Sequence, residues 1–129
     1  MSDYGISKKV DLDYDKAVSK VRESLSTEGF GVLTEIDVKA TLKQKLDKDF
    51  KRYVILGACN PPYAYKALTS ENNIGLLLPC NVIVYENDDG GSTVSVIDPI
   101  VAMNMVDNPV LAGIAKEVRQ KLINVIDLI

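Results

Sequence analysis

Two cysteine–asparagine pairs carry the side chains of this sequence that are most suited to chemistry. They are Cys59-Asn60 and Cys80-Asn81. A thiol can act as a nucleophile or bind a soft metal ion, and a carboxamide can both donate and accept hydrogen bonds. The candidate ligand-binding residues are therefore Cys59, Asn60, Cys80 and Asn81, with Cys59 as the candidate catalytic nucleophile.

The absence of histidine restricts what these residues can do. The chain of 129 residues contains none. Ser-His-Asp and Cys-His mechanisms are excluded, and so are zinc motifs that contain histidine. A general base near neutral pH would have to be a carboxylate, a lysine, a tyrosine or a thiolate with a shifted pKa. The sequence therefore favours binding over catalysis, and it identifies no cofactor.

The residues that follow Cys59 predict the start of a helix. Asn60 is a preferred helix cap, and Pro61 suits the first helical position. A helix N-terminus directly after Cys59 would favour the thiolate form and activate the sulfur. The alternative is that Cys59 is a small apolar residue at the end of a strand and that Asn60 serves only as the cap.

The meaning of the second cysteine depends on how the strands run. If the strand ending at Cys59 and the strand beginning after Cys80 are antiparallel, both sulfurs lie at one end of the sheet, where a disulfide or a soft-metal pair could form. If the strands are parallel, the sulfurs lie at opposite ends. Two thiolates are too few for a closed zinc site, so no metal site is predicted.

The order of the expected elements predicts the fold class. Strand patterns occupy residues 4–10, 30–38, 53–58, 81–86 and 93–98, and helical patterns occupy residues 14–28, 38–50, 61–68 and 109–129. The segment Ile74 to Leu78 is apolar and fits either a loop packed into the core or a contact between subunits. The order β-α-β-α-β-α-β-β-α predicts one α+β domain over residues 1–129, with a mixed sheet packed by helices in two layers.

Composition and charge bound the possible partners. The chain has 15 Lys and Arg against 18 Asp and Glu, and 47% of its residues are hydrophobic, which is typical of a globular protein. No secretory signal and no membrane-spanning stretch is visible, so we expect a cytoplasmic protein that does not enter membranes. The basic residues between Lys39 and Arg52 are typical of a solvated helix face. The alternative is docking of phosphate or an acidic partner, and nucleic acid is not expected.

Several segments together resemble the domain of unknown function 302 family (DUF302). The segments that carry the likeness are Glu28 to Val32, Ala40 to Leu46, Ile55 to Pro61, Ile74 to Val82, Asp98-Pro99 and the final helix. The resemblance implies an α+β domain that associates as a homodimer, and it implies no established activity. Some relatives are joined to redox or sulfur-handling modules, which favours a role for the thiols by analogy.

Two hypotheses about function follow. In the first, the chain is a small-ligand-binding or thiol-chemistry module whose site contains Cys59, Asn60, Cys80 and Asn81. In the second, it is a non-enzymatic homodimeric interaction module in which both cysteines are structural. Its interface would then contain the Ile74 to Leu78 segment and the terminal helix.

Overall fold

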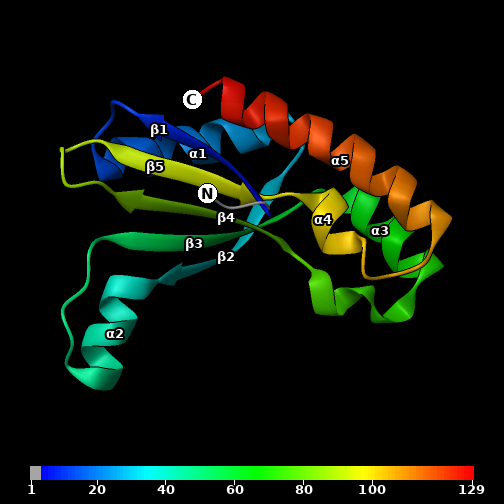
Figure 1. The fold of residues 1–129 in the computed structure, drawn as a ribbon, viewed down its shortest axis with the longest axis horizontal. Coiled ribbons are helices and arrows are strands. Elements are labelled where there is room, and N and C mark those ends of the chain that lie inside the picture. Colours follow the sequence, from blue (N-terminus) through cyan, green and yellow to red (C-terminus); the bar gives the residue numbers. More distant parts are fainter. Residues whose placement is uncertain (1–3) are drawn as a thin grey trace.

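The computed structural model describes residues 4–129 as one sheet with helices around it (Figure 1). The strands are β1 (Gly5–Val10), β2 (Gly31–Asp37), β3 (Tyr53–Cys59), β4 (Cys80–Glu86) and β5 (Ser92–Ile97). The helices are α1 (Tyr14–Thr27), α2 (Val38–Leu46), α3 (Pro61–Ser70), α4 (Pro99–Met103) and α5 (Pro109–Asp127), with the 3-10 helix η1 (Asn72–Leu77) after α3. The α+β class and the predicted order of elements are confirmed.

The five strands are ordered β1-β5-β4-β3-β2, and every neighbouring pair is antiparallel. The expectation of a mixed sheet is corrected on this point. A parallel pair requires a connection that runs back along the whole sheet. Here α2 lies beyond one end of the strands and α3 lies beyond the other (Figure 1), so the chain re-enters the sheet at the end where it left.

One face of the sheet packs against α1 and α5 and forms the main core. The strands contribute every second residue to this face, as alternation in a half-buried strand requires. In β3 these residues are Val54, Leu56 and Ala58, which pack in one cluster with Leu25 of α1 and Leu122 of α5. The residues between them point to the opposite face of the sheet, where Ile55 is partly buried and Gly57 is buried.

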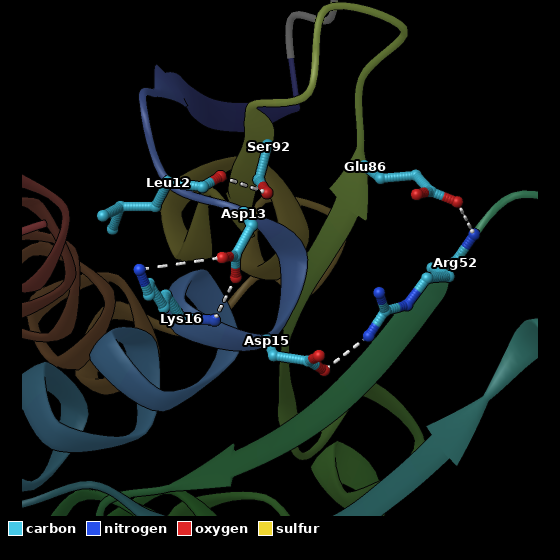
Figure 2. Close-up of polar contacts among 7 residues, drawn as sticks. All are labelled: Leu12, Asp13, Asp15, Lys16, Arg52, Glu86 and Ser92. Atoms are coloured by element: carbon cyan, nitrogen blue, oxygen red, sulfur yellow. Dashed lines mark hydrogen bonds and ion pairs between the residues drawn. The ribbon is translucent and has the colours of Figure 1, made fainter.

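Polar contacts fix the start of α1 at the end of the sheet where β3 begins (Figure 2). The Asp13 carboxylate accepts a hydrogen bond from the backbone N–H of Lys16 at 2.9 Å, which caps the helix. Asp15 forms an ion pair with Arg52, and the backbone N–H of Arg52 donates to Glu86 at 2.7 Å. This end of the domain is therefore held by side chains that are already paired with one another.

Helix α2 ends earlier than its apolar spacing predicts. The stripe of apolar residues continues to Phe50, but the helix stops at Leu46 because Asp47 adopts a left-handed conformation with φ 52°. Aspartate tolerates this conformation better than most residues do. No residue of α2 is buried. Across residues 4–129, none of the helices is long and apolar enough to cross a membrane.

Candidate functional site

The ends of β3 and β4 bring the two cysteine–asparagine pairs to the same end of the sheet. Antiparallel pairing places Ala58 directly opposite Cys80, and Cys59 lies one position further along β3. Both cysteines are free thiols. Of the two arrangements that the sequence left open, the structure adopts the antiparallel one.

A cavity of about 300 Å³ lies at this end of the sheet, between the strand ends and helices α3, α4 and α5. Its wall is almost entirely apolar, and no charged side chain lines it. Cys59, Asn60 and Cys80 belong to the wall, whereas Asn81 does not. The structure therefore brings three of the four candidate residues together around one space.

Small side chains leave this space open. Ala58 of β3, Ala67 of α3 and Ala115 of α5 are buried and line the cavity. A second cluster, in which Ile74 and Leu111 pack against Ala67, lies beside the cavity. Ile74 is buried but Leu76 in the same segment is 88% exposed, so only one side of this segment packs into the interior, and a contact between subunits stays a prediction.

The environment of Cys80 opposes thiolate chemistry. Burial, together with the nearby Cys59, raises the pKa of the Cys80 thiol from 9.0 to about 11. Burial has this effect because it disfavours the charged form. At neutral pH the Cys80 sulfur is therefore a protonated, weakly polar part of the cavity wall.

The helix that was expected to activate Cys59 offers it no hydrogen-bond donor. The first two residues of α3 are Pro61 and Pro62, which have no backbone N–H. The next two donors, the N–H groups of Tyr63 and Ala64, are already bonded to the backbone oxygen of Asn60 at 3.1 and 3.0 Å. The helix dipole acts on an anion mainly through such free N–H groups, so the predicted activation lacks its physical basis.

The strand register also argues against a direct bond between the two sulfurs. Successive side chains on a strand point to opposite faces, so Cys80 shares a face with Ala58, and Cys59 faces the other way. Gly57 lies two residues before Cys59 and therefore belongs to the same face of β3. A Cβ at Gly57 would contact Thr34 and Pro79, away from the main core. Both cysteines are free thiols, and both belong to the wall of the same cavity. Within residues 4–129, no group of three cysteine, aspartate or glutamate side chains could hold a metal ion.

Asn60 occupies the helix-cap position, but its side chain does not cap the helix. Its Nδ2 donates instead to the backbone oxygen of Glu28 at 3.0 Å, across the turn that precedes β2. Gly29 in this turn has a φ of 84°, and a Cβ there would lie 3.4 Å from Nδ2. The expectation that Asn60 is only a cap is therefore wrong, and its carboxamide is held in place from outside the helix.

Asn81 lies away from the other three candidates. It is exposed on β4 opposite Gly57, on the sheet face that carries no main core. It borders a shallow depression with Tyr53 and Tyr85 and has no place in the cavity wall.

The basic segment after β2 is separate from the cavity. Lys39 donates through Nζ to the backbone oxygen of Phe50 at 2.9 Å. Lys43 pairs with Asp47 at 3.0 Å and with Asp49 at 3.5 Å. These local contacts agree with a solvated helix face.

Sequence reasoning missed much of the apolar wall and one short helix. Pro99 and Met103 of α4 line the cavity, but no helix was expected over these residues. The signal was present, because Asp98-Pro99 has the same cap-and-proline form as Asn60-Pro61, from which the start of a helix was predicted. The remaining wall residues resemble ordinary core residues in sequence, and only the fold reveals that they surround a space.

Comparison with known proteins places the chain in a family. The model of the domain of unknown function DUF302 matches residues 6–129. A solved structure from Bacillus stearothermophilus, described as an uncharacterized conserved protein DUF302, is 30% identical. It aligns over 98% of each chain with a TM-score of 0.90. No match is found among the curated proteins. The chain therefore belongs to the DUF302 family, as the motifs around its two cysteines predicted.

Proposed function

We propose that this domain binds a small, uncharged and mostly apolar molecule in the cavity at the end of β3 and β4. The observation that carries the proposal is a space of about 300 Å³ whose wall is almost wholly apolar and has no charged side chain. Ligand pockets in proteins are mostly apolar, with a few polar groups that orient the ligand, and this volume lies at the lower end of their range.

The volume limits the size of the ligand. An engineered apolar cavity of about 150 Å³ holds one benzene molecule. A cavity of about 300 Å³ is therefore suited to a molecule of two fused rings, or to a chain with a similar number of atoms. The lack of charged wall residues disfavours an ionic ligand, because a buried charge without a partner is costly.

Binding fits this site better than thiol catalysis does. Cys80 is protonated at neutral pH because its pKa is raised to about 11. No lysine or arginine lines the cavity beside Cys59, and the sequence has no histidine to act as a base. In this proposal both sulfurs are polarizable parts of the wall that contact the ligand.

Filling the cavity tests the proposal. We expect 2-methylnaphthalene to bind the wild-type protein and Ala115→Leu to weaken that binding at least tenfold, because the added side chain occupies the space. Ala40→Leu is the matched control, since Ala40 is exposed on α2 and lies outside the cavity wall. Binding is measured by naphthalene fluorescence and calorimetry. Failure of the wild-type protein to bind neutral two-ring probes would contradict the proposal.

A second candidate function, self-association, is favoured by the sheet face that carries no main core. Ile55, Ile83, Tyr53 and Tyr85 lie on this face and are only partly buried. The two tyrosine rings stack at 5.4 Å between centroids. An antiparallel sheet usually turns polar residues to solvent, and an apolar patch of this kind marks a contact surface. We propose that two copies pack through it.

Two aspartate substitutions separate the possible interfaces. Ile83→Asp should dissociate a dimer that uses the sheet face, because it places a charge in the contact. Leu76→Asp should not, although Leu76 belongs to the segment that the sequence suggested as an interface and is 88% exposed. Multi-angle light scattering across a dilution series measures the molar mass of both variants. A wild-type protein that stays monomeric at high concentration would contradict self-association.

A further inference from the structure

Asn60 is the one carboxamide in the wall of the cavity, and it is 9% exposed. Its Nδ2 is engaged by the backbone oxygen of Glu28 at 3.0 Å. The opposite atom, Oδ1, accepts no hydrogen bond from any group in residues 4–129. A carboxamide oxygen has two acceptor positions, so this residue keeps unused acceptor capacity.

The contact with Glu28 fixes the orientation of the carboxamide. A backbone carbonyl only accepts hydrogen bonds, so the group that faces it must be the NH₂. Rotating the carboxamide would place two oxygens against each other. Oδ1 is therefore an acceptor that remains available to a ligand, beside the second N–H of Nδ2.

Capping does not explain Asn60 either. The backbone oxygen of Asn60 already accepts from the N–H groups of Tyr63 and Ala64, and Pro61 and Pro62 have no N–H for the side chain to bind. Within residues 4–129 no buried side-chain oxygen or nitrogen lacks a hydrogen-bond partner, so the unbonded Oδ1 is an accessible atom at the cavity wall. In a mostly apolar wall, such an accessible acceptor favours ligands that can donate a hydrogen bond to it.

We propose that Asn60 Oδ1 selects the ligand by accepting a hydrogen bond, so that the natural ligand is a neutral, mostly apolar molecule carrying one O–H or N–H donor. Neutral phenols, indoles and alcohols of about the size of two fused rings belong to this class. The inference rests on the proposed function, since it requires that the cavity binds ligands.

The test compares two probes of nearly equal shape, 2-naphthol and 2-methylnaphthalene. The measured quantity is the ratio of their dissociation constants, because a loss of folding or of cavity shape weakens both probes together. A hydrogen bond of ordinary strength predicts that Asn60→Leu lowers the preference for 2-naphthol by about 3- to 10-fold. Asn81→Ala alters the asparagine of the second cysteine–asparagine pair, which is not part of the cavity wall. This variant should leave the ratio of the two dissociation constants unchanged.

A second measurement uses the wild-type protein alone, in case Asn60→Leu does not fold. Binding of 2-naphthol should shift the ¹H–¹⁵N signals of the Asn60 side-chain amide more than binding of 2-methylnaphthalene does. An unchanged ratio in Asn60→Leu, or equal amide shifts with the two probes, would overturn the role of Asn60 while leaving the proposed function intact. If neither probe binds the wild-type protein, the proposed function fails and this inference fails with it.

Discussion

The two cysteines that border the cavity differ in what surrounds their sulfur atoms. Cys80 packs against the main core. Cys59 is the last residue of β3 and belongs to the opposite face of the strand from Ala58, the partner of Cys80. Neither thiol has a base or a cation in the cavity wall. Both cysteines are partly buried, and neither has an activating group in the cavity wall.

Alkylation should distinguish the two thiols. In the folded protein, iodoacetamide should modify one residue, Cys59, because Cys80 is packed in the core and protonated. The Cys80 thiol should react only after denaturation. Peptide mass spectrometry before and after adding guanidinium measures this. Modification of Cys80 in the folded protein at a rate similar to that of Cys59 would contradict the burial described here.

Cys80 should also make the stability of the fold depend on pH. Its pKa in the folded state, about 11, lies above the ordinary value of 9.0. The folded state therefore binds more protons than the unfolded state between these values, so stability is complete below pH 9 and falls as the pH rises to 11. The loss is on the order of 2 kcal/mol.

Cys80→Ala provides the comparison for this pH dependence. Tyrosines and lysines also titrate in this range, so the useful quantity is the difference between the wild-type and variant free energies of unfolding at each pH. Urea titrations measure it. The free energy of unfolding of the wild-type protein, relative to that of Cys80→Ala, should fall between pH 9 and 11. A difference that stays constant over this range would rule out the raised pKa of Cys80.

The sequence located most of the candidate site but not its chemistry. The pairs Cys59-Asn60 and Cys80-Asn81 pointed to one end of the sheet, and three of these four residues line the cavity. The activation of Cys59 stays a prediction, and its physical support is weak because Pro61 and Pro62 remove the N–H groups that a helix start normally offers.

At the scale of elements, the short helix α4 shapes one side of the cavity. Asp98 caps it by accepting from the N–H of Ile100 at 3.0 Å, and Arg119 of α5 donates to the same carboxylate at 3.0 Å. The Asp98 side chain is well shielded from solvent. One carboxylate therefore holds both the start of α4 and its attachment to α5.

Removing this carboxylate should loosen α4 and weaken ligand binding together. We expect Asp98→Ala to cost about 1–3 kcal/mol of stability, from the lost cap and the lost ion pair. Hydrogen exchange over residues 99–103 should become faster, and 2-naphthol should bind more weakly. Asp37→Ala is the matched control, since Asp37 caps α2 in the same way but lies far from the cavity wall. Equal effects of both variants on binding would contradict this role of α4.

Local patterns predicted the elements better than they predicted how the elements pair. Apolar periodicity and cap residues located every strand, and all helices except α4 and η1. Strand direction could not be derived, because the sequence does not show whether a helix runs back along the sheet or lies beyond its end. The end of α2 was missed because Asp47 adopts a left-handed conformation, which nothing in the apolar spacing of the helix indicates.

At the scale of the whole molecule, the two ends of the sheet have different roles. The end with Asp15, Arg52 and Glu86 is fixed by polar contacts (Figure 2), whereas the end with Cys59 and Cys80 borders an apolar cavity. A space that a ligand fills only in the folded state links binding to stability, because the unfolded chain cannot bind it.

Ligand binding should therefore raise the melting temperature of the domain. At a free 2-naphthol concentration of about 100 times its dissociation constant, linkage predicts about 2.7 kcal/mol of added stability. For a domain of 129 residues this corresponds to a rise of roughly 10 °C. Ala115→Leu should melt higher than the wild-type protein without ligand, since filling a cavity commonly adds about 0.5–2 kcal/mol.

The ligand and the filling side chain compete for the same volume, so their stabilising effects should not add. Adding 2-naphthol to Ala115→Leu should leave its melting temperature nearly unchanged, whereas Ala40→Leu should respond as the wild-type protein does. Calorimetric scans of the three proteins with and without ligand measure both effects. If 2-naphthol raises the melting temperature of Ala115→Leu as much as that of the wild-type protein, the ligand binds outside the cavity between β3, β4 and α5.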